Sequence, residues 1–479
     1  MSTRAERLTF GHVNLGAVPS RTKVAAALAH EPQAVKLTKL ATWDWGWGGL
    51  LIFSILLFFR PQDQITALGA MHASDIAAAV GLGAMAFQNI SRGKPITRMM
   101  PEFTAVVLLG GIILLTVPTS IWPGGSVRVF LDLYIKVALI FMLMVNCATS
   151  PRRIERICWV IVLAFGYISV LAWRDYALGR HLWEGHRVGG AMGGFFENPN
   201  DLALNIAAFL PLALMYVQRP GPLFKRVLSA VIVVLMIGAL FFTKSRSGMV
   251  GAIAMAGVYL FITRSVKPTT VLAGIVAAML VVPALPQTFW DRMASITDET
   301  KDETGSREAR KVLLEQAWMI FLEHPITGVG AGQFMNYGPP GRAEKWRVTH
   351  NALLQIAAEI GVFGLIVFSF LIWRGFASAW WTRRALAWTH RRRPKKKVAV
   401  EDPEDGLDPH ERRFLETHAS AMIACMTAWF VCAQFASVAF NWTFYYLIGL
   451  SVCAREVVRL RAAAYAEAKL LETERVVAA

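Results

Sequence analysis

The chain has 479 residues, of which 55% are hydrophobic and only 17% are charged, with a mean hydropathy of +0.44. Soluble proteins carry about 25% charged residues, so this composition excludes an ordinary soluble protein and favours an integral membrane protein. The formal net charge of +16 is typical of a protein that contacts either nucleic acid or anionic lipid. The five cysteines lie in or beside apolar runs without a CxxC pair, which predicts buried thiols rather than disulfides or structural zinc.

Apolar runs long enough to cross ~30 Å of hydrocarbon recur along the chain, and runs of this length are expected to be α-helices. The sequence therefore predicts an all-α integral membrane protein with about twelve transmembrane helices and a large, partly helical periplasmic loop. The runs lie near residues 45–60, 71–88, 103–121, 129–148, 155–177, 201–218, 226–243, 247–264, 269–286, 350–374, 415–436 and 438–454.

The expected organisation follows from these runs. It comprises a cytoplasmic N-terminal segment without a signal peptide (1–44), transmembrane helices 1–9 with short loops (45–286), the periplasmic loop (287–349), transmembrane helix 10 (350–374), a basic and acidic cytoplasmic loop (375–414), transmembrane helices 11–12 (415–454) and a cytoplasmic C-terminal tail (455–479).

Lys and Arg residues fix the orientation of the predicted helices. They gather in five linkers, at 92–98, 152–156, 219–226, 264–267 and 383–397, which fall on one side when the helices are counted. By the positive-inside rule this side is cytoplasmic. The positive charge therefore reports topology and contact with anionic lipid headgroups, and nucleic acid is excluded as a partner.

Several cations fall on the opposite, outer side, against this rule. Arg187 precedes a glycine-rich stretch, Lys244 and Arg246 lie in the short turn "TKSRSG", and Arg307 and Arg310 begin an amphipathic segment. The turn holds Arg246 at the membrane boundary, where its fork of donors suits a phosphate at headgroup depth. Arg180 is expected to be an ordinary solvated side chain.

Other outer-face motifs have structural explanations as well as functional ones. In "FFENPNDLALNIA", Asn200 or Asp201 can cap the following helix, and Asn198 before Pro199 is typical of a turn. The segment "EHPITGVGAGQF" resembles a phosphate-binding loop only loosely, because it lacks the P-loop lysine and a preceding strand. We therefore reject nucleotide binding.

The stretch "THNALLQIAAEIGVFGL" (349–365) opens the tenth predicted helix with His350 and Asn351. Glu359 lies deeper on this helix, where a carboxylate either ties the outer loop from below or touches substrate. Gly361 and Gly364 are predicted to let a neighbouring helix pack closely.

His350-Asn351, nine residues and then Gly361-x-x-Gly364 resembles the signature of the bacterial O-antigen ligase and O-antigen polymerase superfamily. The other outer-face motifs follow the order of that family, and the resemblance covers roughly residues 100–374. The family usually places a tryptophan one turn after the loop arginine, but Leu314 holds that position here. Whether Arg307 or Arg310 is the loop arginine therefore stays open, although the spacing to Pro325 favours Arg310.

The resemblance implies an inverting glycosyltransferase in the inner (cytoplasmic) membrane of a bacterium, active on the periplasmic face, with no metal, cofactor or nucleotide sugar. Its donor would be a glycan on undecaprenyl diphosphate and its acceptor a hydroxyl of lipid A–core. An O-antigen or exopolysaccharide polymerase and a protein O-oligosaccharyltransferase of the same superfamily stay open, and a lipid-glycan flippase is the alternative from another class. The expected catalytic residues are His350, Arg246 and Arg310, and the expected substrate-binding residues are Arg187, Asn198, Asn200, Lys244, Arg307, Asn351 and Glu359.

Overall fold

Helices make up almost all of the computed structural model, which describes residues 44–65, 71–263, 287–294, 306–338, 347–391 and 406–478. The main helices in chain order are α2 (Trp45–Phe59), α4 (Ala73–Ser91), α5 (Pro101–Leu115), α6 (Pro123–Val129), α7 (Ile135–Cys147), α8 (Pro151–Leu178), α9 (Pro199–Gln218), α10 (Leu223–Thr243), α11 (Arg246–Thr263), α13 (Gln287–Ala294), α14 (Ser306–Glu323), α15 (Ala352–Arg391), α16 (Pro409–Ala433) and α17 (Trp442–Ala478).

Short elements complete the described chain. Two strands, β1 (Leu182–Trp183) and β2 (Arg187–Val188), form an antiparallel hairpin. A π-helical turn, η5 (Phe130–Tyr134), joins α6 to α7 into one continuous span. The 3₁₀ turns are η3 (Pro61–Asp63), η4 (Val117–Thr119), η6 (Gly194–Phe196) and η9 (Phe334–Asn336).

Eight helices in the described residues are long and apolar enough to cross a membrane, which confirms the predicted all-α membrane architecture. They are Pro101–Thr119, Pro123–Cys147, Pro151–Leu178, Pro199–Gln218, Leu223–Thr243, Arg246–Thr263, Ala352–Ala387 and Pro409–Ala433. The shorter apolar helix α2 lies at the first predicted span, and α4 and α17 occupy the second and last. The predicted count of twelve is not confirmed, and the run at 269–286 lies outside the described residues.

Proline and capping side chains explain where many helices start. Five helices have proline in the first turn, where its missing N–H costs no helical hydrogen bond. Ser150, Asn198 and Asp408 each precede one of these prolines, and their side-chain oxygens accept a backbone N–H of the first turn. At the other end of α8, Gly179 ends the helix with φ +66°.

The helix α9 is the centre of the core, because 78% of its most apolar window is buried. It packs against α8, α10, α11 and α16. An aromatic cluster ties these helices to α2 and α17, with the Phe58 ring 5.6 Å from Phe209 and 5.0 Å from Tyr446. All five cysteines are buried free thiols, as predicted.

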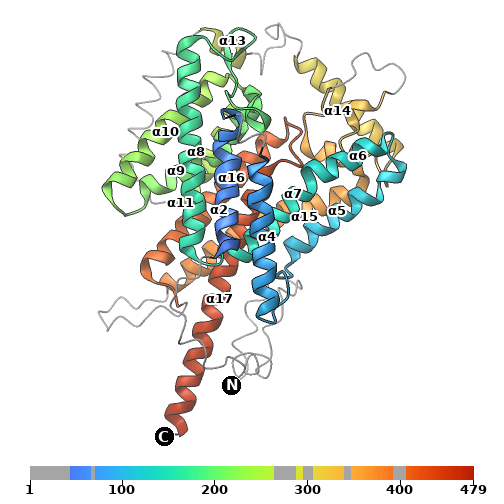
Figure 1. The fold of residues 1–479 in the computed structure, drawn as a ribbon. Coiled ribbons are helices and arrows are strands. Elements are labelled where there is room, and N and C mark those ends of the chain that lie inside the picture. The colour runs from blue at the N-terminus through green and yellow to red at the C-terminus, as the bar shows by residue number, and fades with distance from the viewer. Residues whose placement is uncertain are drawn as a thin grey trace. The chain divides into compact units, whose positions relative to one another are not determined.

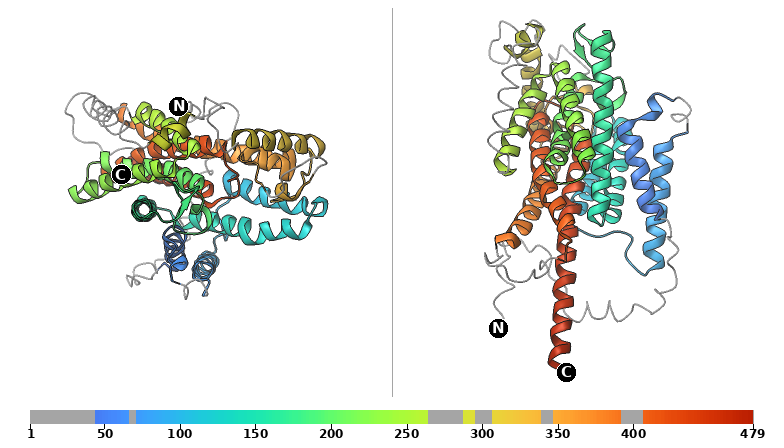
Figure 2. Two further views of the ribbon diagram at one scale, coloured as in Figure 1. Left: turned by 90° about the horizontal axis from the view of Figure 1, so that it is seen from above. Right: turned by 90° about the vertical axis from the view of Figure 1, so that its left-hand side faces the viewer.

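Two helices from the long segment before α15 and the C-terminal tail lie at opposite ends of the described residues. The short helix α13 and the helix α14 lie at one end, and the C-terminal part of α17 extends past the other end (Figure 1). Figure 2 shows α2 and α4 side by side at one edge of the bundle, where they are in contact. The strand hairpin follows the last turn of α8, so it belongs to the same end as α13.

A buried ion network joins three helices near the end from which α17 extends. Glu102 is fully buried near the start of α5, and both of its carboxylate oxygens accept from guanidinium groups. Arg374 of α15 lies 2.6 Å from Oε1, and Arg455 of α17 lies 2.6 Å from Oε1 and 3.0 Å from Oε2. Removing one partner from such a network leaves a buried charge uncompensated, so the network fixes α15 relative to α5 and α17.

Candidate active site

Arg187 on β2 joins three segments that are distant in the sequence. Its side chain is 5% exposed, and its Nε donates a 3.1 Å hydrogen bond to the carbonyl of Thr243 at the end of α10. Its Nη2 donates a 2.7 Å bond to Oδ1 of Asn200 on α9. The hydroxyl of Ser245 also donates to Asn200 Oδ1, at 2.9 Å. Arg187 and Asn200 therefore hold the strand hairpin, the start of α9 and the α10–α11 turn together.

The α10–α11 turn is built from the predicted "TKSRSG" motif. Lys244 is buried and takes a left-handed conformation with φ +46°, which reverses the chain after α10. The N–H of Ser245 donates to the Thr243 hydroxyl at 3.2 Å, and Arg246 is the first residue of α11 and half-buried. A side chain at Gly248 would overlap Ala203, so this glycine lets α11 start directly against α9.

Asn198 is the N-cap of α9, since its Oδ1 accepts the N–H of Asn200 at 2.8 Å. The expectation that Asn200 or Asp201 caps this helix is therefore wrong. Both residues lie one or two positions inside the first turn, because Pro199 occupies the first helical position. The structure thus gives Asn198 a capping contact, and it leaves the Asn200 side chain to bind Arg187.

Sequence reasoning missed two residues that contact the turn and the strand hairpin, Arg292 and Glu184. Arg292 on α13 donates a 3.1 Å hydrogen bond from Nε to the Lys244 carbonyl, and its Nη1 lies 3.1 Å from Oε2 of Glu184. Glu184, in the turn of the strand hairpin, also lies 3.4 Å from Arg187 Nη1. No local pattern marks this pairing, because Arg292 and Glu184 are far apart in the sequence.

The cationic side chains around the turn disfavour one another's protonated form. Burial, and then the charge of Arg292, lower the pKa of Arg187 to about 10. Burial, followed by the charges of Arg292 and Arg187, also lowers the pKa of Lys244. Repulsion of this kind is relieved when an anion binds among the cations. We name Arg187, Lys244, Arg246, Arg292 and Arg310 the cationic cluster.

Arg310 belongs to this cluster and is also electrostatically coupled to His350. Its charge contributes to the lowered pKa of both Arg187 and His350. Arg310 is half-buried and lies two helical turns before Ala317, which is fully buried on the same face of α14. Arg307 also lies in α14, but its side chain is outside the described residues.

His350 lies at the mouth of α15 with a left-handed backbone, φ +53°. Its N–H donates a 3.0 Å hydrogen bond to the hydroxyl of Ser437, which pairs with the Thr349 hydroxyl at 2.8 Å. Burial, and then the charges of Arg310 and Arg347, lower the pKa of His350 to about 4. The imidazole is therefore neutral near pH 7 and can accept a proton or a hydrogen bond.

Asn351 is the N-cap of α15. Its Oδ1 accepts the N–H groups of Leu353 and Leu354, both at 2.9 Å, and its Nδ2 lies 3.3 Å from the Gln434 carbonyl. Of the two residues in the predicted His-Asn pair, Asn351 thus has contacts that start the helix and tie it to α16. These contacts orient the backbone from which His350 projects.

The helix α15 is broken at Ile360 and Gly361, which have non-helical backbone angles. Gly361 has φ +72° and ψ −169°, a conformation that is essentially restricted to glycine. The break frees backbone groups for the loop after α14. The carbonyls of Ala358 and Glu359 accept from Val329 and Gly330 at 2.9 and 2.8 Å.

Two more hydrogen bonds join the loop after α14 to α15. The N–H of Val362 donates to the Pro325 carbonyl at 2.8 Å, and Oε2 of the buried Glu359 accepts the Gly332 N–H at 2.8 Å. Of the two roles expected for Glu359, this contact corresponds to tying the outer loop. The loop also uses its amides internally, with Gly328 N–H donating to the His324 carbonyl at 2.9 Å.

The prediction that Gly361 and Gly364 make room for a neighbouring helix is wrong. A side chain at Gly361 would overlap the Ile326 carbonyl of the loop, and one at Gly364 would overlap Ile360 of its own helix. The sequence pattern hid this difference, because helix packing and a helix break both favour glycine in an apolar run.

The structure thus brings together most of the predicted site residues at one end of the bundle. Arg187, Asn200 and Lys244 share one network, Arg310 connects it electrostatically to His350, and Asn198, Asn351 and Glu359 make scaffold contacts beside it. Within the described residues, no group of three or more His, Cys, Asp or Glu side chains is arranged to hold a metal ion.

Comparison with known proteins gives a family match to part of this chain. A family model described as O-antigen ligase matches residues 231–369, a segment that includes the α10–α11 turn, α14 and the mouth of α15. The teichuronic acid biosynthesis protein TuaE of Bacillus subtilis (strain 168) is 28% identical over 195 residues, which are 37% of this chain and 40% of that protein. The match therefore spans less than half of the relative's length.

The matched segment contains Lys244, Arg246, Arg310 and His350, which are four of the residues that the motif order singles out. The predicted resemblance is confirmed to this extent: residues 231–369 of this chain match the family model described as O-antigen ligase, and TuaE is a distant relative.

Proposed function

We propose that the protein transfers a glycan from undecaprenyl diphosphate to an acceptor hydroxyl on the periplasmic face of the inner membrane. The observation that carries this proposal is the concentration of buried and half-buried positive charge around the α10–α11 turn, electrostatically coupled to a neutral imidazole. Burying cations is costly unless an anion compensates them. A lipid-borne diphosphate supplies that anion at the membrane boundary, where the turn joins two membrane-spanning helices.

The proposed reaction is a single displacement. The acceptor oxygen forms a bond to the anomeric carbon while the bond from that carbon to the phosphate oxygen breaks. The electron pair leaves with the diphosphate, whose charge is stabilised by Arg246 and Arg310 as part of the cationic cluster. The hydroxyl proton passes to a ring nitrogen of His350, and attack opposite the leaving group inverts the configuration.

Donor binding would also raise the pKa of His350. In the free protein, the charges of Arg310 and Arg347 add to burial in lowering the pKa of His350 to about 4. A bound diphosphate offsets this positive field, so the pKa of His350 rises in the complex and the imidazole becomes a better proton acceptor. The donor itself thus contributes to activating the base.

The acceptor is proposed to be a hydroxyl of lipid A–core. A growing polysaccharide is the second candidate acceptor, because the relative TuaE is named for teichuronic acid biosynthesis rather than for lipid A. Both acceptors use the same donor chemistry, so the cationic cluster supports either one.

The test uses the purified protein in nanodiscs with a glycan on undecaprenyl diphosphate and each acceptor in turn. We expect a new glycosidic bond and release of undecaprenyl diphosphate only when an acceptor is present. Product with lipid A–core supports the ligase, and product with a second lipid-linked glycan supports the polymerase. In liposomes, movement of the intact lipid-linked glycan across the bilayer without a new bond would replace the proposal with a flippase.

A further inference from the structure

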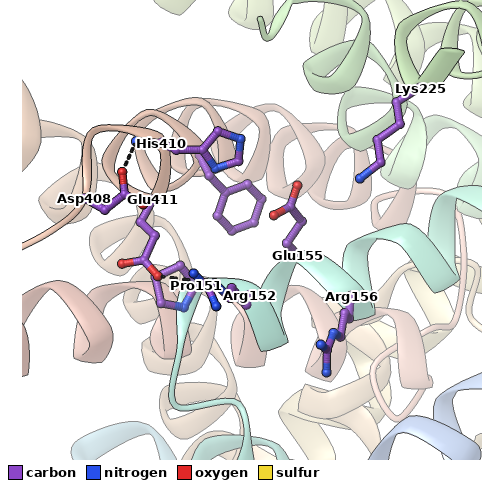
Figure 3. A pocket seen from close by; sticks show the side chains of 9 residues that line it. Pro151, Arg152, Glu155, Arg156, Lys225, Asp408, His410 and Glu411 are labelled. Carbon is purple, nitrogen blue, oxygen red and sulfur yellow. Dashed lines mark hydrogen bonds and ion pairs between the residues drawn. The ribbon is translucent and has the colours of Figure 1, made fainter. Parts of the chain in front are cut away.

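A cavity of ≈ 380 Å³ lies at the opposite end of α8 and α10 from the cationic cluster (Figure 3). Its lining comes from the beginnings of α8, α10 and α16, which converge there. The lining residues are Pro151, Arg152, Glu155, Arg156, Lys225, Asp408, His410, Glu411 and Phe414. The proposed transfer reaction uses none of these residues.

The depth of the cavity follows from the helices that form it. All three are membrane-spanning helices, beginning at Pro151, Leu223 and Pro409, and the lining side chains belong to their first two turns or to the cap before them. The start of a span is the level at which the chain leaves the hydrocarbon and meets the headgroups. Lipid phosphates occupy this level.

Two of the carboxylates in the cavity already have donors. Glu155 accepts a 2.7 Å hydrogen bond from Nη1 of Arg219, a nearly buried side chain that also lies 3.0 Å from the His410 ring. Oδ1 of Asp408 accepts the His410 N–H at 2.9 Å, which caps α16. The charge of Glu155 is therefore offset by Arg219, whereas Asp408 keeps its charge and caps α16.

Counted together with Arg219, the charged groups around the cavity are four cations and three carboxylates, so one net positive charge remains. Glu411 lies 3.9 Å from Nε of Arg152, so these two offset each other. Lys225 places its ammonium 5.6 Å from the ring centroid of Trp159, and among the described residues neither Lys225 nor Arg156 forms an ion pair with a carboxylate. Two such cations on one cavity favour a phosphate group.

We propose that this cavity binds the phosphate of an anionic phospholipid headgroup, with Arg156 and Lys225 as its ligands and Phe414 as an apolar wall. Inorganic phosphate has the same chemistry at the charged end. The depth of the cavity favours the lipid, because a lipid can place its acyl chains along the apolar surfaces of α8 and α10 while its phosphate reaches both cations.

The test compares two double variants that remove the same charge from full-length protein in detergent. Arg156→Gln with Lys225→Gln changes the cavity. Arg92→Gln with Arg413→Gln is the control, because both arginines are exposed and lie outside the lining. Thermal unfolding and native mass spectrometry are followed during titration with phosphatidylglycerol, phosphatidylcholine or inorganic phosphate.

We expect phosphatidylglycerol to bind and stabilise the wild type and the control, and its affinity to fall about 30-fold in the cavity variant. Phosphatidylcholine and inorganic phosphate should bind far more weakly to all three. Equal affinity of both double variants for phosphatidylglycerol would overturn the site. Stabilisation by inorganic phosphate that matches phosphatidylglycerol would overturn the lipid as its occupant. The exposed single variant Arg156→Gln gives the same comparison if the double variant unfolds.

Discussion

Oε2 of Glu359 accepts a 2.8 Å hydrogen bond from the amide of Gly332, and this bond joins the broken helix α15 to the loop that follows α14. The carboxylate is 3% exposed, so water cannot readily replace the bond. Because α14 carries Arg310, the contact fixes an arginine of the proposed site relative to His350 at the mouth of α15. Glu359, which lies deeper in α15 than His350, thus helps to fix the position of Arg310 relative to His350.

Replacing Glu359 tests this positioning role. Glu359→Leu leaves the Gly332 N–H unpaired, which should lower the free energy of unfolding by about 1–3 kcal/mol. Turnover per folded molecule should fall as well, because the loop and Arg310 lose their fixed place. Glu359→Gln keeps an acceptor oxygen and should retain most of both. Thermal unfolding and transfer assays measure the two effects, and a Gln variant as impaired as the Leu variant would argue against the hydrogen bond as the cause.

Gly361 provides a test of the helix break. Alanine at Gly361 must adopt φ +72° and overlaps the Ile326 carbonyl, so we expect a loss of at least about 1–3 kcal/mol in stability and a lower yield of folded protein. Gly257→Ala in α11 is the matched control, since a side chain there meets nothing within 4 Å. Chemical unfolding in detergent compares the two, and a Gly361→Ala protein as stable as wild type would be incompatible with the observed backbone.

Much of this architecture could be predicted from local patterns. Hydropathy located most of the membrane-spanning helices, since length and apolarity are properties of each segment alone. The order of motifs singled out Lys244, Arg246, Arg310 and His350, all of which fall in the matched family segment. The break at Gly361 could not be predicted, because the apolar pattern continues through it without change.

Contacts between segments that are distant in the sequence also could not be predicted. Arg292 of the cationic cluster pairs with Glu184 across 108 positions of the sequence, and no motif or periodicity encodes this contact. The sequence predicts the wrong N-cap for α9, because Asn198, Asn200 and Asp201 are all residue types that cap helices well. Only the position of Pro199 in the first turn separates them, and the geometry then gives Asn200 to Arg187.

The role of Arg246 can be separated from its charge. Arg246→Lys keeps the positive charge but loses the bidentate fork, so we expect transfer to fall tenfold or more, with normal abundance in the membrane. Arg246→Ala should be more impaired, since one charge-assisted bond contributes about 1.5–3 kcal/mol and tenfold corresponds to about 1.4 kcal/mol. The exposed Arg180→Lys is the matched control and should leave transfer unchanged. Wild-type transfer by Arg246→Ala would remove Arg246 from the proposed site.

The pH dependence of transfer tests whether His350 accepts the proton. A general base works only when deprotonated, so activity is lost as the pH falls through its pKa. The pH profile of kcat/KM reports the free protein and should lose activity near pH 4, where burial, Arg310 and Arg347 place the pKa of His350. The profile of kcat reports the donor complex, in which the diphosphate offsets Arg310, so its acid limb should lie at higher pH.

His350→Ala should reduce kcat by about 10²–10⁴-fold and remove this limb, with donor affinity and thermal stability close to wild type. His350→Gln can orient the acceptor but cannot take up a proton, so appreciable activity in this variant would reassign His350 from proton acceptor to acceptor positioning.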